Sequence, residues 1–374
     1  MLLNSRGYLP GGPDVAGWNL VHRAAAGPNL QILHSVLQAT SRTHWMERTL
    51  KGETALFLAV QAGNMAQTEA LLHLDFDPNV HANNDETPLY AAVKQGSLSI
   101  LRLLLKKGAK VDKPCHNQWT ALHEAAKLNR KELAECLLMA SADKERRTCY
   151  GFTPLSVAAH NGNADIMELL LRKGANVQAQ ATDGASVLHE AANYGDPACT
   201  SLLLQYGADV HLPKKTGHLP LHGSAYRGHL AVLEMLLPLT KRNVVYRSGI
   251  SPLHSAAAGE HSQCVKLLLS HGYSVNYPLA GHVAQNYNDK RRSALFFAVS
   301  NGDLNTARLL LEAGAKTNLD PLNVVLVAVR HGNHAMVQLL LEHGADANCY
   351  VLVNTTRFPS AIQNALRDKV IQGH

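Results

Sequence analysis

The chain has 374 residues, of which 46% are hydrophobic, 17% are charged and 5% are aromatic, and its formal net charge is +6. This composition excludes a disordered chain, which would be poorer in apolar residues, and the small excess of positive charge does not call for nucleic acid. The longest aliphatic run (324–329) is too short for a membrane span, no apolar stretch at the start predicts a secretory signal, and the six cysteines form no C-x-x-C pair. We therefore expect a reduced, cytoplasmic protein, with the nucleus also open, and no membrane partner.

Ten segments of one pattern follow each other along the chain, and each predicts the first helix of a helix-turn-helix unit. Between residues 54 and 219 every step is 33 residues. A second apolar segment follows at a fixed offset, as in ILRLLLKKGA at 100–109, and predicts the second helix. The ten segments are NLVHRAA at 19, TALFLAV at 54, TPLYAAV at 87, TALHEAA at 120, TPLSVAA at 153, SVLHEAA at 186, LPLHGSA at 219, SPLHSAA at 251, SALFFAV at 293 and NVVLVAV at 323.

The spacing within each unit explains why the units must stack. Leu122, Ala125 and Ala126 lie at i, i+3 and i+4, so they share one face of a short helix. A glycine such as Gly96 ends most of the first helices, because glycine enters the left-handed region at little cost, and Asn129 replaces it in the fourth unit. No unit can bury its apolar face alone, so the units are expected to form one continuous core.

This pattern resembles the ankyrin repeat, whose signature is T-P-L-H-x-A at a 33-residue period. The resemblance implies an all-α fold, an ankyrin-repeat solenoid of about ten helix-turn-helix units with short extended fingers. We expect a flexible N-terminal segment at 1–17, one elongated repeat domain at 18–350, and the start of an incomplete eleventh repeat at 351–374. About nine extra residues fall in the loop 277–293, and Pro238 is expected to end the second helix of the unit at 219.

The histidines suggest a metal-binding site, but the repeat pattern offers another explanation for several of them. Five of them occupy the fourth position of the motif, where local hydrogen bonding is the expected role. HEAAK at 123 and HEAAN at 189 lack the second histidine of H-E-x-x-H, and His331, His334 and His343 have no cysteine or carboxylate beside them. The five motif histidines are His22, His123, His189, His222 and His254.

A calcium loop and an enzyme are two further alternatives. The segment 75–86 places Asp75, Asp77, Asn79 and Glu86 at calcium-loop positions, but Val80 replaces the required glycine. Nucleophile and phosphate motifs are missing, and no acidic pair converges. We expect no catalytic residue, no metal and no cofactor, and hence a binding protein rather than an enzyme.

Basic and aromatic side chains recur just before the motifs, on the predicted fingers of units four to nine. Aromatic residues and arginine are enriched in binding hot spots, so this ridge predicts an unidentified target protein with an acidic segment. Nucleic acid is disfavoured because dense basic stripes are missing. The alternative is solvated loop charges, with Trp119 and Phe152 packed between fingers. The candidate partner-binding residues are Trp119, Arg146, Arg147, Tyr150, Phe152, Lys214, Lys215, Arg247, Arg291 and Arg292.

Three stretches, at 235–257, 275–299 and 345–366, resemble the ankyrin repeat and SOCS box family. The resemblance implies an ankyrin array that captures a target protein, and a C-terminal SOCS box that binds elongin B, elongin C and a cullin in a ubiquitin ligase. The box would show an L-x-x-x-C helix and then L-P-x-P, and neither follows the repeats. The resemblance implies a substrate-recognition module in protein ubiquitination and intracellular signalling. Two interpretations follow: the chain is a fragment or shortened form that has lost its box, or it is a target-binding module that acts without ligase recruitment. We expect it to bind the same target without marking it and so to compete with full-length relatives. The alternative is a generic ankyrin scaffold with no ubiquitin role.

Overall fold

The computed structural model describes residues 12–285 and 291–348. The chain divides into two compact units between Val244 and Val245, and each unit is described by itself. The predicted eleventh repeat at 351–374 lies outside the described residues.

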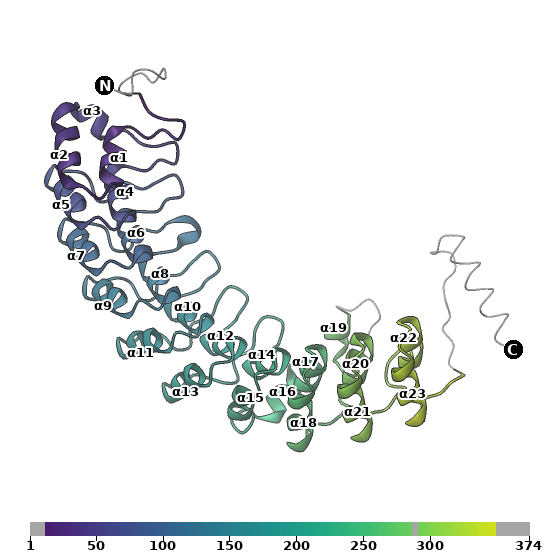
Figure 1. Ribbon diagram of the computed structural model, residues 1–374. Helices are drawn as coiled ribbons and strands as arrows, with labels where there is room; N and C mark the ends of the chain where they lie inside the picture. The colour runs from purple at the N-terminus through teal and green to yellow at the C-terminus, as the bar shows by residue number, and fades with distance from the viewer. Residues whose placement is uncertain (1–11, 286–290, 349–374) are drawn as a thin grey trace. The chain divides into compact units, whose positions relative to one another are not determined.

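The first unit contains seven helix pairs, and the predicted helical repeat is confirmed in each (Figure 1). The first helices lie in one row beside the finger loops, and the second helices form the row behind them. The first helices are α1 (Leu20–Ala26), α4 (Ala55–Gln61), α6 (Pro88–Gln95), α8 (Ala121–Lys127), α10 (Pro154–His160), α12 (Val187–Tyr194) and α14 (Pro220–Arg227). The second helices are α2 (Leu30–Ala39), α5 (Met65–His73), α7 (Leu98–Lys106), α9 (Lys131–Met139), α11 (Ala164–Arg172), α13 (Pro197–Gln205) and α15 (Leu230–Leu236).

The second unit repeats the same plan with three helix pairs. Successive first helices pack against each other, and so do successive second helices, with α20 between α17 and α22 in the first row. The first helices are α17 (Pro252–Ala258), α20 (Ala294–Asn301) and α22 (Val324–Arg330), and the second helices are α18 (Ser262–Ser270), α21 (Leu304–Glu312) and α23 (His334–Glu342). No strand occurs in the part of the chain that the structure describes, where pairing is limited to one isolated bridge between Gln180 and Ser186.

Local chemistry sets the ends of each helix, as α6 illustrates. The side chain of Thr87 accepts a hydrogen bond from the backbone N–H of Tyr90, and Pro88 occupies the first turn. Gly96 ends the helix with a φ of 90°. The buried face presents Leu89 and Ala92 to the core, at 1% and 0% exposure.

Four short helices lie outside the predicted pattern: α3 (Arg42–Trp45), the 3-10 helix η2 (His116–Gln118), α16 (Arg242–Arg247) and α19 (Gly281–Ala284). The predicted placement of Arg247 on a finger is therefore wrong, because this residue ends α16. Val245 is completely buried, so a helical turn at this point contributes a residue to the core. The helix α19 occupies part of the loop 277–293, in which the extra residues were expected.

The N-terminal segment also departs from expectation. Gly17 N–H donates to the Asp14 carbonyl, and Leu50 N–H donates to the Ala16 carbonyl at 3.0 Å, so residues 14–17 already belong to the first finger. The repeat structure thus begins before residue 18.

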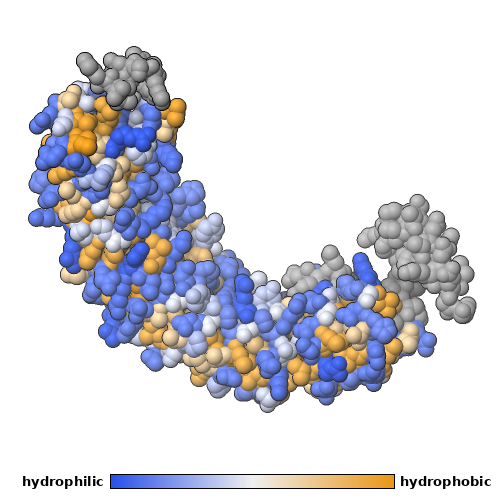
Figure 2. All heavy atoms as spheres, in the orientation of Figure 1, coloured by the Kyte–Doolittle hydropathy of each residue, from blue (hydrophilic) through white to orange (hydrophobic). Residues whose placement is uncertain are grey.

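Hydrophilic atoms cover much of the visible surface of the repeats, with smaller hydrophobic patches between them (Figure 2). Within residues 12–285 and 291–348, no helix combines the length and the apolar character needed to cross a bilayer.

Candidate protein-binding surface

Backbone hydrogen bonds tie each finger of the first unit to a neighbouring finger. Thr182 N–H donates to the Tyr150 carbonyl at 2.9 Å, and Lys215 N–H donates to the Asp183 carbonyl at 2.9 Å. Gly151 makes this close approach possible, since a Cβ there would lie 2.8 Å from the Thr182 nitrogen and its φ is +80°. The fingers are therefore held in fixed register and present their side chains from a rigid base.

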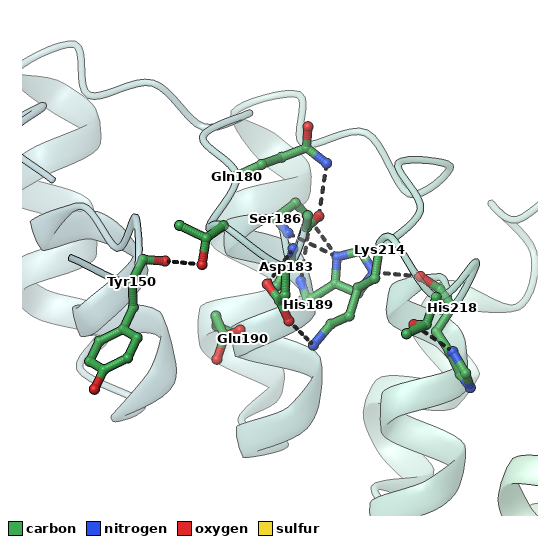
Figure 3. A network of polar contacts seen from close by, with 12 residues as sticks. Tyr150, Gln180, Asp183, Ser186, His189, Glu190, Lys214 and His218 are labelled. Atoms are coloured by element: carbon green, nitrogen blue, oxygen red, sulfur yellow. Dashed lines mark hydrogen bonds and ion pairs between the residues drawn. The ribbon is translucent and has the colours of Figure 1, made fainter. Parts of the chain in front are cut away.

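The motif histidines form a second set of ties between fingers. In His189, Nδ1 accepts from the Ser186 backbone N–H at 3.1 Å, so Nε2 carries the proton and donates to the His218 carbonyl at 2.9 Å (Figure 3). His123 and His254 make the same contacts, to the carbonyls of Phe152 and Arg292. Burial lowers the pKa of His123, His189 and His254 to about 4. These observations confirm the predicted role of the motif histidine in local hydrogen bonding.

The predicted ridge residues divide between the two units. Seven lie in the first unit and three, Arg247, Arg291 and Arg292, in the second. Their role in partner binding stays a prediction, but the structure shows contacts within the same unit for most of these residues, while Arg146 is half-buried.

In the first unit, two of the predicted cations make contacts within the fold. Arg147 donates from Nη1 to the Gln180 carbonyl at 2.8 Å, and the Lys214 Nζ lies 3.5 Å from an Asp183 carboxylate oxygen (Figure 3). Lys215 is exposed. The ridge is therefore partly a set of structural contacts between fingers, and less of its charge is available to a partner than the sequence suggests.

The aromatic members of the ridge differ in exposure. Tyr150 is 59% exposed, whereas Trp119 and Phe152 are half-buried. The Trp119 ring lies 5.3 Å from the His123 ring, and the Phe152 ring lies 6.3 Å from that of His160. Trp119 and Phe152 therefore pack within the repeats, as the alternative interpretation expected, and still leave part of their rings at the surface.

In the second unit, two neighbouring arginines have different contacts. The guanidinium of Arg291 lies 5.0 Å and 4.9 Å from the ring centroids of Phe296 and Phe297. The backbone N–H of Arg292 donates to a carboxylate oxygen of Asp320 at 2.5 Å, while its side chain is exposed. Of this pair, Arg292 offers the more accessible side chain.

Sequence reasoning missed two buried carboxylates on the first helices, Glu124 of α8 and Glu190 of α12, each 5% exposed. Glu124 Oε2 accepts from the Tyr90 hydroxyl at 2.7 Å and from Trp119 Nε1 at 3.0 Å. Glu190 Oε2 lies 2.8 Å from Nδ1 of His160, and this hydrogen bond raises the pKa of His160. The sequence did contain a sign of them, since both follow the motif histidine in HEAA.

The groups tested for metal binding and catalysis serve the repeat instead. Within residues 12–285 and 291–348, no group of three or more metal-ligating side chains converges. In the calcium-like segment, Asn79 accepts from the Lys110 backbone N–H at 2.7 Å and donates to the Gly108 carbonyl at 3.1 Å. Burial raises the pKa of the Cys115 and Cys264 thiols to about 11, so neither is a ready nucleophile at neutral pH.

Comparisons with known proteins agree with this geometry. The family model described as "Ankyrin repeats (3 copies)" matches residues 21–115, 111–181, 155–246, 188–279, 240–321 and 275–351. The Mus musculus protein "Ankyrin repeat and SOCS box protein 14" is 48% identical over 139 residues, which cover 37% of this chain and 24% of that protein. The Bos taurus protein "Dynein axonemal heavy chain 12" is 52% identical over 142 residues, which cover 38% of this chain and 40% of that protein.

A solved structure gives the same fold. The crystal structure of the human ASB11 ankyrin repeat domain matches with a TM-score of 0.54 and 27% identity, over 59% of this chain and 97% of that domain. The chain spans less than half the length of the two relatives named above. Since those two names describe different proteins, the matches show a shared repeat architecture and not a shared activity.

Proposed function

Because this chain belongs to the ankyrin repeat family, we propose that it is a protein–protein interaction module that captures a target protein on its fingers and first helices, and that it resembles the substrate-recognition part of an elongin–cullin–SOCS-box ubiquitin ligase. Recruitment of the ligase by this chain is a separate point, which affinity purification decides. The observation that carries the proposal is the repeat match over residues 21–351, together with the similarity to ankyrin repeat and SOCS box protein 14. The rigid, tied fingers support it, because a binding surface on a fixed base loses less conformational entropy on association. The working place of this module would be the cytoplasm or the nucleus.

The ligase part of the proposal concerns partners outside this chain. Elongin B, elongin C and a cullin are the partners that the family resemblance implies, and they would join a target protein to ubiquitin transfer. The chain itself would bind and orient the target, with no covalent step of its own.

Affinity purification of the tagged chain from cells tests both parts. Recovery of a target protein together with stoichiometric elongin B and C would support the ligase receptor. A target recovered without elongins would leave the capture function intact and remove the ligase assignment. Recovery of membrane-skeleton or cytoskeletal proteins alone would favour a generic scaffold, and recovery of nothing above a mock control would refute the capture function.

A further inference from the structure

Two buried carboxylates occupy equivalent positions in alternate repeats of the first unit. Glu124 of the fourth repeat and Glu190 of the sixth directly follow the motif histidine, and each is 5% exposed. The fifth repeat has Val157 at this position, at 4% exposure. The row of first helices therefore carries negative charge at two points with an apolar residue between them.

Neither carboxylate has a permanently charged partner. Glu124 receives hydrogen bonds from neutral donors, and Glu190 faces His160, whose charge depends on pH. Among the described residues, no lysine or arginine forms an ion pair with either one. A desolvated charge without a cation is costly, so a cation brought by a partner would be stabilised here.

Each carboxylate also has an unused oxygen. Both recorded side-chain contacts of Glu124 go to Oε2, and the His160 contact of Glu190 goes to Oε2 as well. Neither Oε1 atom is among the fully enclosed polar atoms that lack a partner in the described part of the chain. Oε1 is therefore the oxygen of each carboxylate to which a hydrogen-bond donor of a ligand would bind.

An aromatic ring contacts each of the two carboxylates. Trp119 donates a hydrogen bond to Glu124, and the largely exposed His160 contacts Glu190. The half-buried Phe152 lies 6.3 Å from the His160 ring, centroid to centroid. Aromatic faces beside carboxylates favour guanidinium and ammonium groups, which combine cation–π attraction with charged hydrogen bonds. We call Trp119, Glu124, Phe152, His160 and Glu190 the aromatic–carboxylate surface.

The stacking of helices sets the distance between the two acids. The helices α8, α10 and α12 pack in succession. Packed helices lie about 8–10 Å apart, so two steps span roughly 16–20 Å. An extended chain advances about 3.3 Å per residue and would cover that distance in about five or six residues.

From these observations we infer that the aromatic–carboxylate surface binds an extended segment of the target that carries two basic residues, Arg or Lys, about five or six positions apart. This inference rests on the proposed capture function and adds the chemistry of the captured segment. It favours a basic segment over the acidic one that the ridge predicted, because Arg147 and Lys214 are already engaged within the fold.

A selection from random 12-residue peptides, displayed on phage, tests the inference with the purified full chain. We expect paired Arg or Lys residues at the stated spacing to be enriched. Glu124→Gln and Glu190→Gln keep the shape of each side chain and one acceptor oxygen but remove the negative charge, and each should weaken a selected peptide by about tenfold or more. Glu135→Gln and Glu234→Gln serve as matched controls, because they remove the same charge from exposed positions on second helices.

The outcomes distinguish a failure of the inference about the basic segment from a failure of the proposed capture function. Peptides that are acidic or neutral, or that bind the Glu124 and Glu190 variants as tightly as the controls, would overturn the inference and leave the capture function standing. If no peptide and no cellular protein binds, the capture function fails as well. Thermal unfolding of each variant checks folding, and the composition of the peptides selected by the unaltered chain decides the question even if one variant unfolds.

Discussion

Acid should destabilise the first unit through its buried motif histidines. Burial lowers the pKa of His123 and His189 from 6.5 to about 4 in the folded protein. Between these values the unfolded chain binds more protons than the folded one, so the free energy of unfolding falls as the pH drops from 6.5 towards 4 and is unaffected above 6.5. At pH 5 each histidine should lose about 2 kcal/mol of stability, and the pair about 4 kcal/mol.

Neighbouring groups modify this figure without changing its sign. Burial also lowers the pKa of His22 and His218, which adds to the loss. His160 acts in the opposite direction, because its hydrogen bond to Glu190 raises its pKa, but its side chain is 63% exposed and solvent screens the pair.

Tryptophan fluorescence during urea unfolding measures this effect in the first unit alone. The three tryptophans, Trp18, Trp45 and Trp119, all lie before residue 244. We expect a clear fall in the urea midpoint between pH 7.5 and pH 5.0. The variant His189→Phe places at this position the residue that the chain already uses at Phe57, and its pH-dependent loss should be smaller by about 2 kcal/mol.

Two results would refute this reasoning. One is an equal pH dependence in the unaltered chain and in the His189→Phe variant, which would place the titrating group elsewhere. The other is a midpoint that rises as the pH falls, since that requires a group whose pKa is raised on folding.

Four further substitutions have distinct expected outcomes. Gly151→Ala should lower the free energy of unfolding by roughly 3 kcal/mol, because φ is +80° and the added Cβ would meet the next finger. Gly174→Ala has a similar φ of +77° but open space around the added Cβ, so it should lower the free energy of unfolding by only about 1 kcal/mol. Urea unfolding measures both. Leu170→Ala removes a completely buried side chain of α11 and should lower stability by about 2–5 kcal/mol in the same assay. Asp320→Ala removes the acceptor for the N–H of Arg292 and for Ser293, so hydrogen exchange at the start of α20 should accelerate about tenfold; unchanged exchange would show that this cap contributes little.

The repeat could be predicted from sequence because the same physical demand recurs every 33 residues. Each helix pair must bury one apolar face, so leucine and alanine spacing places α6 and α8 without further information. Glycine is not strictly required at the left-handed positions that end the helices. Ser141 and Glu260 stand where other repeats have glycine, and they adopt φ values of 66° and 63°. Packing of the repeats imposes the conformation, and glycine only reduces its cost.

The short helices could not be predicted from the sequence, because each occurs once and none follows the 33-residue period. Nothing in the Arg242–Arg247 segment repeats elsewhere, so only the burial of Val245 identifies it as part of the core. The contacts of individual charges escaped for a related reason: a residue's neighbours in the next repeat lie about 30 positions away. Glu190 and His160 are 30 residues apart, and Lys214 and Asp183 are 31 apart.

This separation also explains why side-chain type alone is a poor guide to the binding chemistry of a repeat surface. Backbone hydrogen bonds join adjacent fingers. The long side chain of Arg147 therefore reaches the next finger, where it donates a hydrogen bond to the Gln180 carbonyl. Glu124 and Glu190 lie on the first helices α8 and α12, where their carboxylates are buried. Aromatic side chains make hydrogen bonds to these carboxylates but carry no permanent charge. Stacking therefore engages two of the finger cations, Arg147 and Lys214, while Glu124 and Glu190 on the helices form no ion pair with lysine or arginine in the described part of the chain. The preference of the surface depends on which buried charges the fold leaves without an ion pair, and in repeats four to six the buried carboxylates of Glu124 and Glu190 form no ion pair with lysine or arginine among the described residues.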